Sequence, residues 1–331
     1  MRAVKLVDAH DLRVVELPDP EPAADEVLIR VDGCGICGSD LSSYKVGLFT
    51  DAVPGHEFAG TIEATGDNVT GWRTGDRTVV DPKMPCGACE DCRHGQSHRC
   101  AIALTAGLGF ARDGGFAQHV VAPATLLHRL PLTLGLHDAC LVEPLSIAIH
   151  GVERARLREP TSAIVVGLGP IGLFTVAVLK ARGMEPIIGV DPVDDRRRLA
   201  LELGAGNVAG ELHEVRATVE PSQAVFECSG KAELLHGVAD LTAPGGVMVM
   251  LGVPFGEATV APLMWVTREI DIRGSIAQTV DDFEASIAML AGDPSLARIV
   301  TKRIALDDVP SAFEDLLAPS SGGKIVVDPA L

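Results

Sequence analysis

A glycine-rich turn at the centre of the chain restricts what the sequence can fold into. Residues 167–172 read Gly-Leu-Gly-Pro-Ile-Gly directly after an apolar run at residues 163–166, and a second apolar run, residues 187–190, ends at Asp191. In a strand–turn–helix unit, such glycines permit a close approach of the backbone to a pyrophosphate, whose charge the helix N-terminus favours. A carboxylate after the next strand can accept hydrogen bonds from a ribose. The pattern predicts a dinucleotide site; the competing interpretation is a turn that only packs a helix on a strand.

The same alternation continues through the central part of the chain. Further elements are predicted as helices at residues 171–181 and 196–203 and as strands at residues 224–227, 247–251 and 270–273. Strands that alternate with helices form parallel sheets covered on both faces, and such strands read as continuous apolar runs. We therefore expect a doubly wound α/β sheet, and no membrane span at residues 161–179, where glycines and a proline interrupt the apolar run.

The two ends of the chain have a different character. Short β-rich runs at residues 26–31, 59–64 and 77–80 are separated by Gly, Pro and Asp, which predicts an irregular antiparallel β-domain. A helix at residues 281–290 and a strand at residues 323–327 complete the chain. Because 331 residues exceed the size of most single cores, two domains are expected.

Charge and cysteine content narrow the classes of partner. The formal net charge of −17 repels phosphate backbones and anionic lipid surfaces, so we expect neither a nucleic acid nor a membrane partner. The N-terminus carries no apolar targeting segment, which favours a cytoplasmic protein with reduced thiols. Closely spaced cysteines then indicate metal binding in preference to disulfides.

Four of the eight cysteines share one short segment with the spacing C-x2-C-x2-C-x7-C: Cys86, Cys89, Cys92 and Cys100. Four thiolates can close a tetrahedron around Zn²⁺ and leave no open position, as in structural zinc sites. The competing interpretations are a disulfide pair and four unrelated thiols. His94 and His98 lie within the segment, and with four thiols available we expect both to be exposed.

A second set of potential ligands is spread through the same half of the chain. It comprises Cys37 in GCGICGSD, His56 and Glu57 in PGHEFAG, and Glu143 in LVEPL. A thiolate, an imidazole and a carboxylate are the ligand types of catalytic zinc, which keeps one position for water or substrate and lowers the pKa of a bound hydroxyl. Taken singly, a His or Cys is more often a core or surface residue than a ligand.

Together these motifs resemble the zinc-containing medium-chain dehydrogenases, especially the polyol and threonine dehydrogenases. The resemblance covers essentially the whole chain and is carried by CGICGSD, PGHEFAG, GDRTVV, the four-cysteine segment, GGFAQHV, VEPL, GLGPIG and ECSG. It implies a GroES-like β-rich catalytic domain from residues 1–144 and 276–331, and a Rossmann nucleotide-binding domain from residues 145–275. It also implies a homodimer or homotetramer.

The resemblance implies roles for individual residues. Cys37 and His56 match ligands of the catalytic zinc, and Ser39 matches the hydroxyl that takes the substrate proton. Glu57 and Glu143 match two carboxylates that bind or approach that zinc. The positions that match the cofactor site are Gly167, Gly169, Pro170, Ile171, Gly172, Asp191 and Arg196.

One position departs from the family pattern. Many relatives carry a histidine that passes the proton onward, and the corresponding residue here is Ser42, which cannot act as a base near neutral pH. Either the relay ends at the cofactor ribose and water, or another residue, such as His150 or Glu57, completes it. Candidate substrate-pocket residues are Tyr44, Phe49 and Phe110, whereas three cysteines without assigned chemistry are expected to be buried: Cys34, Cys140 and Cys228.

The sequence thus predicts an enzyme with two zinc ions per chain that interconverts a small polar secondary alcohol and its ketone. Asp191 favours NAD over NADP because its carboxylate repels a 2′-phosphate, although Arg196, Arg197 and Arg198 follow closely. A zinc-free carbon–carbon double-bond reductase would lack the zinc ligands. A non-catalytic NAD-binding regulator or scaffold would keep the nucleotide motif and could lose them.

Overall fold

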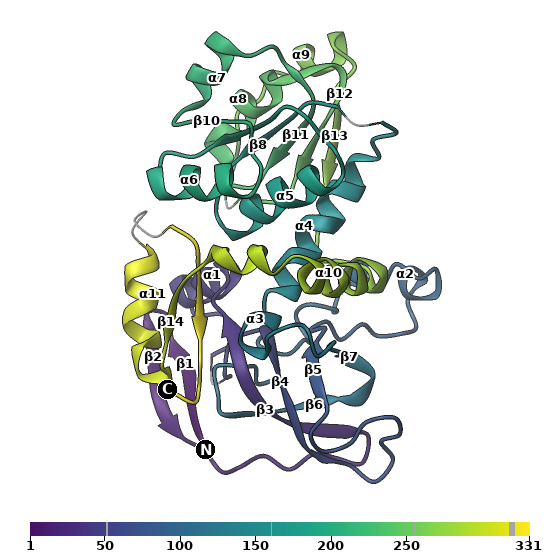
Figure 1. Cartoon of the computed structure of the whole chain (residues 1–331), viewed down its shortest axis with the longest axis vertical. Helices are drawn as coiled ribbons and strands as arrows, with labels where there is room; N and C mark the ends of the chain where they lie inside the picture. Colours follow the sequence, from purple (N-terminus) through teal and green to yellow (C-terminus); the bar gives the residue numbers. More distant parts are fainter. Residues whose placement is uncertain (51, 160, 255, 318–321) are drawn as a thin grey trace. The chain divides into compact units, whose positions relative to one another are not determined.

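The computed structural model describes residues 1–50, 52–159, 161–254, 256–317 and 322–331. The chain divides into two units: Met1–Glu143 with Thr279–Leu331, and Pro144–Gln278 (Figure 1). The predicted boundaries, at residues 144/145 and 275/276, lie close to those of these units. None of the described helices is long and apolar enough to cross a bilayer.

The first unit is built on a seven-stranded sheet in the order β14-β15-β3-β4-β5-β7, with β6 paired to β3. Its strands are β3 (Glu26–Gly35), β4 (Glu57–Thr65), β5 (Arg77–Val80), β6 (His119–Pro123), β7 (Leu127–Arg129), β14 (Val300–Ile304) and β15 (Lys324–Val327). All neighbours are antiparallel except β14 and β15, which run parallel. The C-terminal strand therefore completes a sheet that begins near the N-terminus.

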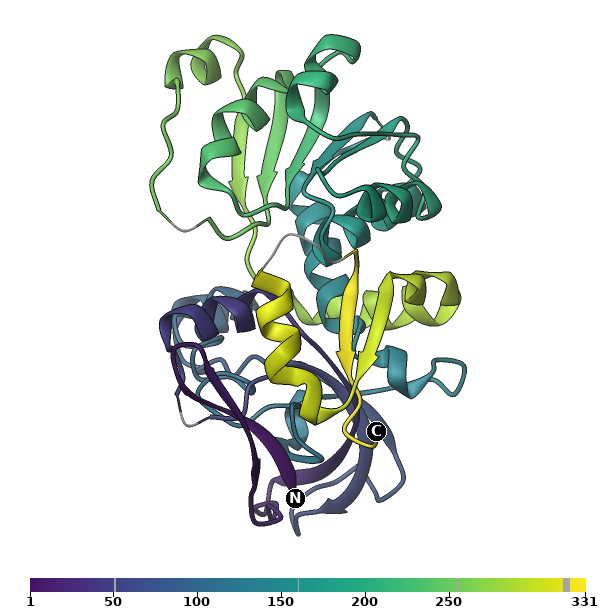
Figure 2. The same ribbon diagram turned by 90° about the vertical axis from the view of Figure 1, so that its left-hand side faces the viewer.

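The remaining elements of this unit surround the sheet. They are the paired strands β1 (Arg2–Asp8) and β2 (Asp11–Glu16), and the helices α1 (Gly38–Val46), α2 (Glu90–Arg93), α3 (Leu136–Ala139), α10 (Val280–Gly292) and α11 (Val309–Leu317). Helix α11 lies beside the β1–β2 hairpin, so both ends of the chain meet in this unit (Figures 1 and 2).

The core of the first unit follows from alternation along β3. Val27, Ile29 and Val31 are buried, and the strand becomes buried on both faces toward its end. These side chains join one apolar cluster with three phenylalanines, Phe58, Phe116 and Phe313. The register places Gly35 opposite Glu57, so the segments that follow β3 and precede β4 leave the sheet side by side. These two segments carry Cys37 and His56.

The second unit is a six-stranded parallel sheet in the order β10-β9-β8-β11-β12-β13. Its strands are β8 (Ala163–Val166), β9 (Ile187–Val190), β10 (Asn207–Ala209), β11 (Ser222–Glu227), β12 (Thr242–Met250) and β13 (Asp271–Gly274). The helices are α4 (Val142–Ala155), which begins at the unit boundary, α5 (Pro170–Ala181), α6 (Asp194–Glu202), α7 (Leu212–Thr218), α8 (Leu235–Asp240) and α9 (Pro262–Thr267). The strand order reverses between β8 and β11, which is where sheets of this kind bind nucleotides.

The predicted doubly wound α/β class with a β-rich domain is confirmed, and β5, β8 and β9 have the predicted bounds. The largest difference is β12, which begins at Thr242 instead of residue 247. Pro244, Gly245 and Gly246 lie between the observed start of the strand and the predicted one. In the structure Gly245 takes φ +70°, and the pairing of β11 with β12 shifts register there, so the strand continues through these residues.

Candidate functional site

The glycine turn after β8 has the geometry that a dinucleotide requires. Gly167 has φ +88°, and a Cβ there would lie 2.6 Å from the Ser229 nitrogen. At Gly172 a Cβ would lie 1.8 Å from the Gly167 carbonyl oxygen, so both positions exclude larger residues. A Cβ at Gly169 would meet nothing within 4 Å. The backbone is therefore open to a phosphate at the N-terminal end of α5, which begins at Pro170.

Asp191 is held against this turn. Its side chain is buried, its Oδ2 accepts a hydrogen bond from the Leu168 N–H at 2.8 Å, and its Oδ1 accepts one from the Val193 N–H at 2.9 Å. Arg196 Nη1 lies 3.5 Å from Asp191 Oδ2. The carboxylate is thus fixed at the end of β9, next to the second residue of the glycine motif.

The two following arginines are engaged elsewhere. Arg197 donates to the Asp191 carbonyl oxygen at 2.6 Å and also contacts the Asp194 carboxylate. Arg198 pairs with Asp195 at 3.0 Å, and both side chains are mainly exposed. Of the three arginines, Arg196 is the one whose guanidinium reaches the Asp191 carboxylate.

The four-cysteine segment forms a candidate metal centre. The sulfur atoms of Cys86, Cys89, Cys92 and Cys100 all lie within 4.8 Å of one another. The Cys86 N–H points at Cys100 Sγ at 3.4 Å, and the Cys89 N–H at Cys86 Sγ at 3.3 Å. Backbone N–H groups of Ala88 and Cys89 lower the pKa of Cys86 to about 6. Burial acts in the opposite direction on Cys92 and raises its pKa to about 12, so the backbone favours a thiolate at Cys86 within the group of converging sulfurs.

The histidines of this segment were predicted to be exposed, and that prediction is wrong for His98. Its side chain is buried, whereas His94 is exposed. His98 lies in a short 3-10 turn that packs its ring inward just before Cys100. Neither histidine joins the group of converging sulfur atoms.

A second group of potential ligands lies where β3 and β4 leave the sheet. One ligand atom each from Cys37, His56 and Glu57 falls within 4.8 Å of the others. Cys37 directly precedes α1 as its N-cap residue, and Glu57 is the first residue of β4. His56 and Glu57 are buried, whereas Cys37 is partly accessible. Cys37 lies about twenty residues before His56 and Glu57 in the sequence, and the three side chains meet because β3 pairs with β4.

Asp40 orients this group, although sequence reasoning gave it no role. Its Oδ2 accepts a hydrogen bond from the Cys37 N–H at 2.8 Å, and its Oδ1 lies 3.3 Å from His56 Nδ1. Burial opposes a charge on His56, but Asp40 and Cys37 outweigh it and raise the pKa of His56 well above its usual value. With Nδ1 directed at Asp40, Nε2 is the atom available to a metal. Ser39 Oγ lies 3.5 Å from that Nε2.

Lys324 is the second residue that sequence reasoning missed. Its Nζ contacts Glu57 Oε1 at 2.6 Å and Oε2 at 2.5 Å, and it donates to the Ile36 carbonyl oxygen at 3.0 Å. Both side chains of the ion pair are buried. Burial opposes the charge on Lys324, yet Glu57 outweighs it and raises the pKa of that ammonium. Lys324 therefore ties together the segments that carry Cys37 and His56.

Glu143 lies in the first turn of α4 and is buried, but it is not among the ligand atoms that converge within 4.8 Å. Burial raises its pKa to about 7, while the charge of His56 acts in the opposite direction and that of Glu57 raises it further. Its electrostatic partners are thus the residues of the second group. Glu143 is therefore near enough to interact electrostatically with His56 and Glu57, but its carboxylate is not as close to Cys37 and His56 as that of Glu57 is.

Aromatic rings cover one side of the second group. Phe110 stacks on the His56 ring with 4.8 Å between centroids, and Phe49 meets Phe110 edge-on at 5.6 Å. The Tyr44 ring is buried against Phe313, and its hydroxyl donates a hydrogen bond to Glu314. Tyr44 lies on the same face of α1 as Asp40, the other buried residue of that helix.

The remaining predicted residues have simple surroundings. Ser42 donates a hydrogen bond to the Gly38 carbonyl oxygen at 3.0 Å within α1. Cys34 and Cys140 are buried, as expected, but Cys228 is only partly buried. Cys228 directly follows β11, where the chain leaves the sheet beside the glycine turn, and this explains its accessibility.

Comparisons with known proteins agree with this architecture. The model of the alcohol dehydrogenase GroES-like domain matches residues 23–132, and that of the glucose dehydrogenase C-terminus matches residues 137–318. The chain is 31% identical to a sorbitol dehydrogenase from Bombyx mori, over 98% of this chain and 97% of that one. It is 32% identical to an L-threonine 3-dehydrogenase from Streptomyces avermitilis, over 96% of each. A protein from Sinorhizobium meliloti, solved with NADP, is 30% identical with a TM-score of 0.90 and 99% coverage of both chains.

A Rossmann-type sheet and a GroES-like unit on one chain define an oxidoreductase of the alcohol dehydrogenase type. The chain belongs to the zinc-containing medium-chain dehydrogenase/reductase family, which confirms the resemblance seen in its sequence motifs.

The buried ion pair gives a prediction about stability. Lys324→Gln should lower the free energy of unfolding by roughly 3 kcal/mol, because it leaves the buried Glu57 carboxylate without a counter-charge. The double change Lys324→Gln with Glu57→Gln should recover part of this loss, since no buried charge then remains. Urea unfolding of the four proteins in the cycle measures both effects.

The exposed pair Lys180–Glu185 provides the control for this cycle. Its two side chains are 50% and 68% exposed, so Lys180→Gln should change the free energy of unfolding by less than about 1 kcal/mol. If Lys324→Gln and Lys180→Gln lowered the free energy of unfolding equally, the buried pair would contribute no more to stability than the exposed one.

Proposed function

We propose that the protein is a zinc-dependent, NAD-linked dehydrogenase that interconverts a secondary alcohol and a ketone on a small polar substrate. The observation that carries the proposal is the convergence of Cys37, His56 and a carboxylate, with Ser39 Oγ 3.5 Å from His56 Nε2, in a chain that also has an open glycine turn. Its relatives include a sorbitol and a threonine dehydrogenase. A polyol, an aminocyclitol or a hydroxy amino acid is the corresponding substrate class.

Both ligand groups fit zinc by their chemistry. Four sulfurs with N–H···S contacts match a closed structural site, which we assign to Cys86, Cys89, Cys92 and Cys100. Cys37 and His56, with one carboxylate from Glu57 or Glu143, match an open catalytic site in which the fourth position stays free for substrate. When bound, zinc would favour loss of the hydroxyl proton, and NAD would accept the hydride.

The side chains around the second group have distinct tasks in this proposal. Asp40 fixes the tautomer of His56 by facing Nδ1, as carboxylates commonly do for ligating histidines. Ser39 accepts the proton of the substrate hydroxyl. Lys324 neutralises Glu57 and holds it beside Cys37, so that the site does not accumulate uncompensated negative charge.

The proton route beyond Ser39 ends in this proposal at the cofactor ribose and water. Ser42 uses its hydroxyl hydrogen within α1, and a hydroxyl does not titrate near neutral pH. Glu57 has both oxygens on Lys324, which disfavours it as a proton carrier. His150 is buried and belongs to the second unit, whereas Ser39 belongs to the first.

The two metal sites should respond differently to loss of one thiolate. Cys37→Ser should leave a folded protein that binds NADH and keeps one zinc per chain, but lowers kcat by about a thousandfold or more, because a catalytic metal supplies several kcal/mol of charge stabilisation. Cys89→Ser should instead lower the thermal midpoint and keep the catalytic zinc. Metal analysis, NADH titration and NADH absorbance with a panel of polyols, aminocyclitols, 3-hydroxy amino acids and simple secondary alcohols provide the readouts.

The outcome for Cys37→Ser decides the assignment. Near-native turnover in that variant with zinc present would mean that Cys37 is not a catalytic ligand. A wild-type protein that binds NADH but oxidises no member of the panel would favour a non-catalytic NAD-binding regulator.

The preference for NAD over NADP rests on the position of Asp191. Its buried carboxylate stands at the end of β9, where the adenosine ribose lies in folds of this kind, and it would repel a 2′-phosphate. Arg197 is held by a backbone carbonyl and Asp194, and Arg198 by Asp195. Arg196 alone would oppose the repulsion, and it already shares its charge with Asp191.

We therefore expect kcat/KM for NAD to exceed that for NADP by at least about tenfold, equivalent to roughly 1.4 kcal/mol. Asp191→Ala should reduce this ratio by weakening NAD and relieving the repulsion of NADP. Glu202→Ala, which removes an exposed carboxylate at the C-terminal end of α6, should leave the ratio unchanged. If the wild-type enzyme uses NADP as well as NAD, Arg196 governs the choice and this assignment fails.

We further propose that the protein is a homodimer or homotetramer assembled through the edge of the parallel sheet. Among the described strands β13 pairs with β12 alone, so its other edge is open. Exposed apolar side chains gather in the surrounding segment: Val253, Leu263, Met264, Val266, Ile272 and Ile276. An open strand edge with apolar flanks can pair with the same edge of a second copy, because an isologous interface uses the same surface on both subunits.

The double change Leu263→Lys with Val266→Lys should shift the mass in solution toward the monomer, since it adds like charges to an apolar surface. Leu132→Lys, at an 87% exposed position of the first unit, is the matched control and should leave the mass unchanged. Light scattering coupled to size exclusion reports both. A double variant with the wild-type mass would place the interface elsewhere.

A further inference from the structure

Helix α1 carries Ser39 of the proposed active site, and only two of its side chains are buried. It begins after Cys37 and holds Ser39 in its first turn, and its two buried side chains are Asp40 and Tyr44. These two residues are four positions apart and therefore lie on one face of the helix. The orientation of Ser39 and Cys37 toward His56 thus depends on how Asp40 and Tyr44 pack against the rest of the unit.

Asp40 holds the N-terminal end of the helix through its contacts with Cys37 and His56, and Tyr44 holds the C-terminal end. The Tyr44 ring packs edge-on against Phe313, with 5.4 Å between centroids, and against His10 at 5.0 Å. Its hydroxyl donates a hydrogen bond to the Glu314 carboxylate on α11. The His10 N–H also donates to the Tyr44 carbonyl oxygen at 2.9 Å.

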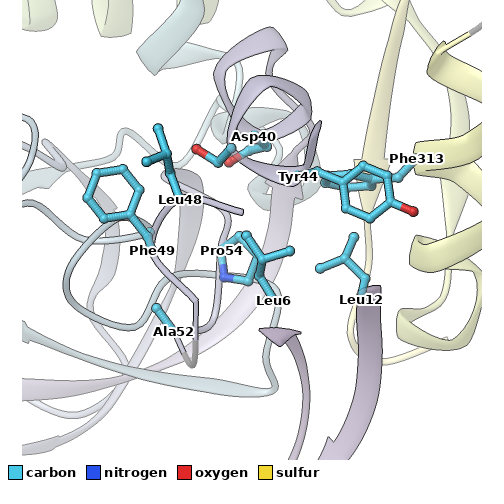
Figure 3. Close-up of a pocket in the computed structure, with 11 residues that line it drawn as sticks. Leu6, Leu12, Asp40, Tyr44, Leu48, Phe49, Ala52, Pro54 and Phe313 are labelled. Atoms are coloured by element: carbon cyan, nitrogen blue, oxygen red, sulfur yellow. The ribbon is translucent and has the colours of Figure 1, made fainter. Parts of the chain in front are cut away.

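The cavity between α1 and the elements that pack against it is too small for the helix to rotate or shift into another position. A cavity lined by Leu6, Leu12, Asp40, Tyr44 and Phe313, among others, measures about 10 Å³, roughly the space of one water molecule (Figure 3). Figure 3 shows the Tyr44 ring beside Phe313, with its hydroxyl turned away from Asp40 and toward α11. The hydroxyl therefore serves no substrate contact, and its partner is Glu314.

We propose that Tyr44 and Glu314 are positioning residues for the catalytic site, which lock the rotation of α1 and thereby set Cys37 and Ser39 relative to His56. The proposal rests on the dehydrogenase function proposed above. It assigns a task to α11, which lies about 270 residues from α1 in the chain and contacts it directly. Because Glu314 is exposed at the surface, the lock can be altered without disturbing the core.

Tyr44→Phe keeps the ring and removes the hydroxyl, so the fold should persist. We expect kcat to fall about tenfold, because misplacement of reacting groups by 1 Å or less costs one to two orders of magnitude. The KM for NAD should not change. Glu314→Ala should reproduce this loss, while Glu314→Gln, which keeps an acceptor oxygen, should restore kcat to within about twofold of wild type, since a neutral acceptor still holds the hydroxyl. Asp315→Ala, at an exposed carboxylate on the same helix, is the matched control and should retain wild-type kcat.

A readout independent of turnover is the rate at which a chelator removes zinc. Tyr44→Phe and Glu314→Ala should release zinc from the Cys37 site several-fold faster than wild type, because the helix end that presents the thiolate is less fixed. Zinc at the four-cysteine segment should leave at the wild-type rate in every variant and is the internal reference. The Cys37→Ser protein identifies which kinetic phase belongs to which site.

The two sets of measurements separate this proposal from the proposed function. If Tyr44→Phe and Glu314→Ala retain wild-type kcat and wild-type zinc release, the lock does not exist, whatever the enzyme acts on. If both variants release zinc faster but the wild-type protein oxidises no alcohol, the lock holds and the dehydrogenase assignment fails. Failure of Glu314→Gln to recover kcat and zinc release would contradict a role through the hydrogen bond.

Discussion

The buried ion pair between Lys324 and Glu57 is the interaction on which the catalytic unit depends most. An ammonium group in a protein interior is tolerated only with a counter-charge and partners for its hydrogens, and Lys324 has Glu57 and the Ile36 carbonyl. Glu57 follows His56, and Ile36 precedes Cys37, so one side chain fixes both ligand-bearing segments. This contact also requires β15 to pair with β3. The first unit is therefore complete only when the C-terminal strand, which follows the second unit in the sequence, pairs with it.

The two candidate metal centres show different ways to gather ligands. In the four-cysteine segment the sulfurs come from fifteen consecutive residues, and backbone N–H groups of the same segment stabilise the thiolates. In the second group the ligands come from two segments joined by the sheet register, and charged neighbours surround them. Asp40 faces His56, Lys324 neutralises Glu57, and burial raises the pKa of Glu143. Local chain geometry suits a closed, rigid site, whereas a site that must keep an open position needs support from several elements.

In the second unit, too, some features of the site arise within one short segment and others from contacts between segments. The glycine turn is determined by steric limits that can be stated residue by residue, because a Cβ at Gly167 or Gly172 would collide with backbone atoms. Asp191 reaches that turn from the next strand and bonds the Leu168 N–H. This contact holds the carboxylate in place before any cofactor arrives, which keeps the ordering cost of binding small. The adjacent arginines are distributed among neighbouring acids, so their number says little about the local charge.

The sequence by itself determined the features that arise from short stretches of chain: the strand–turn–helix unit, the cysteine spacing, the limits of β5, β8 and β9, and the candidate ligands Cys37, His56 and Glu57. Such features depend on steric rules and on residue types a few positions apart. Only the tertiary structure decided the roles of residues whose partners are distant in the chain. In the sequence Lys324 has no feature that separates it from a surface lysine, and its role appears only when β15 pairs with β3. Tyr44 follows the cysteine motif and suggested a pocket residue, yet the face of α1 on which it lies turns it toward α11. Which face of a short polar helix is buried depends on what packs against it, and that information lies elsewhere in the chain.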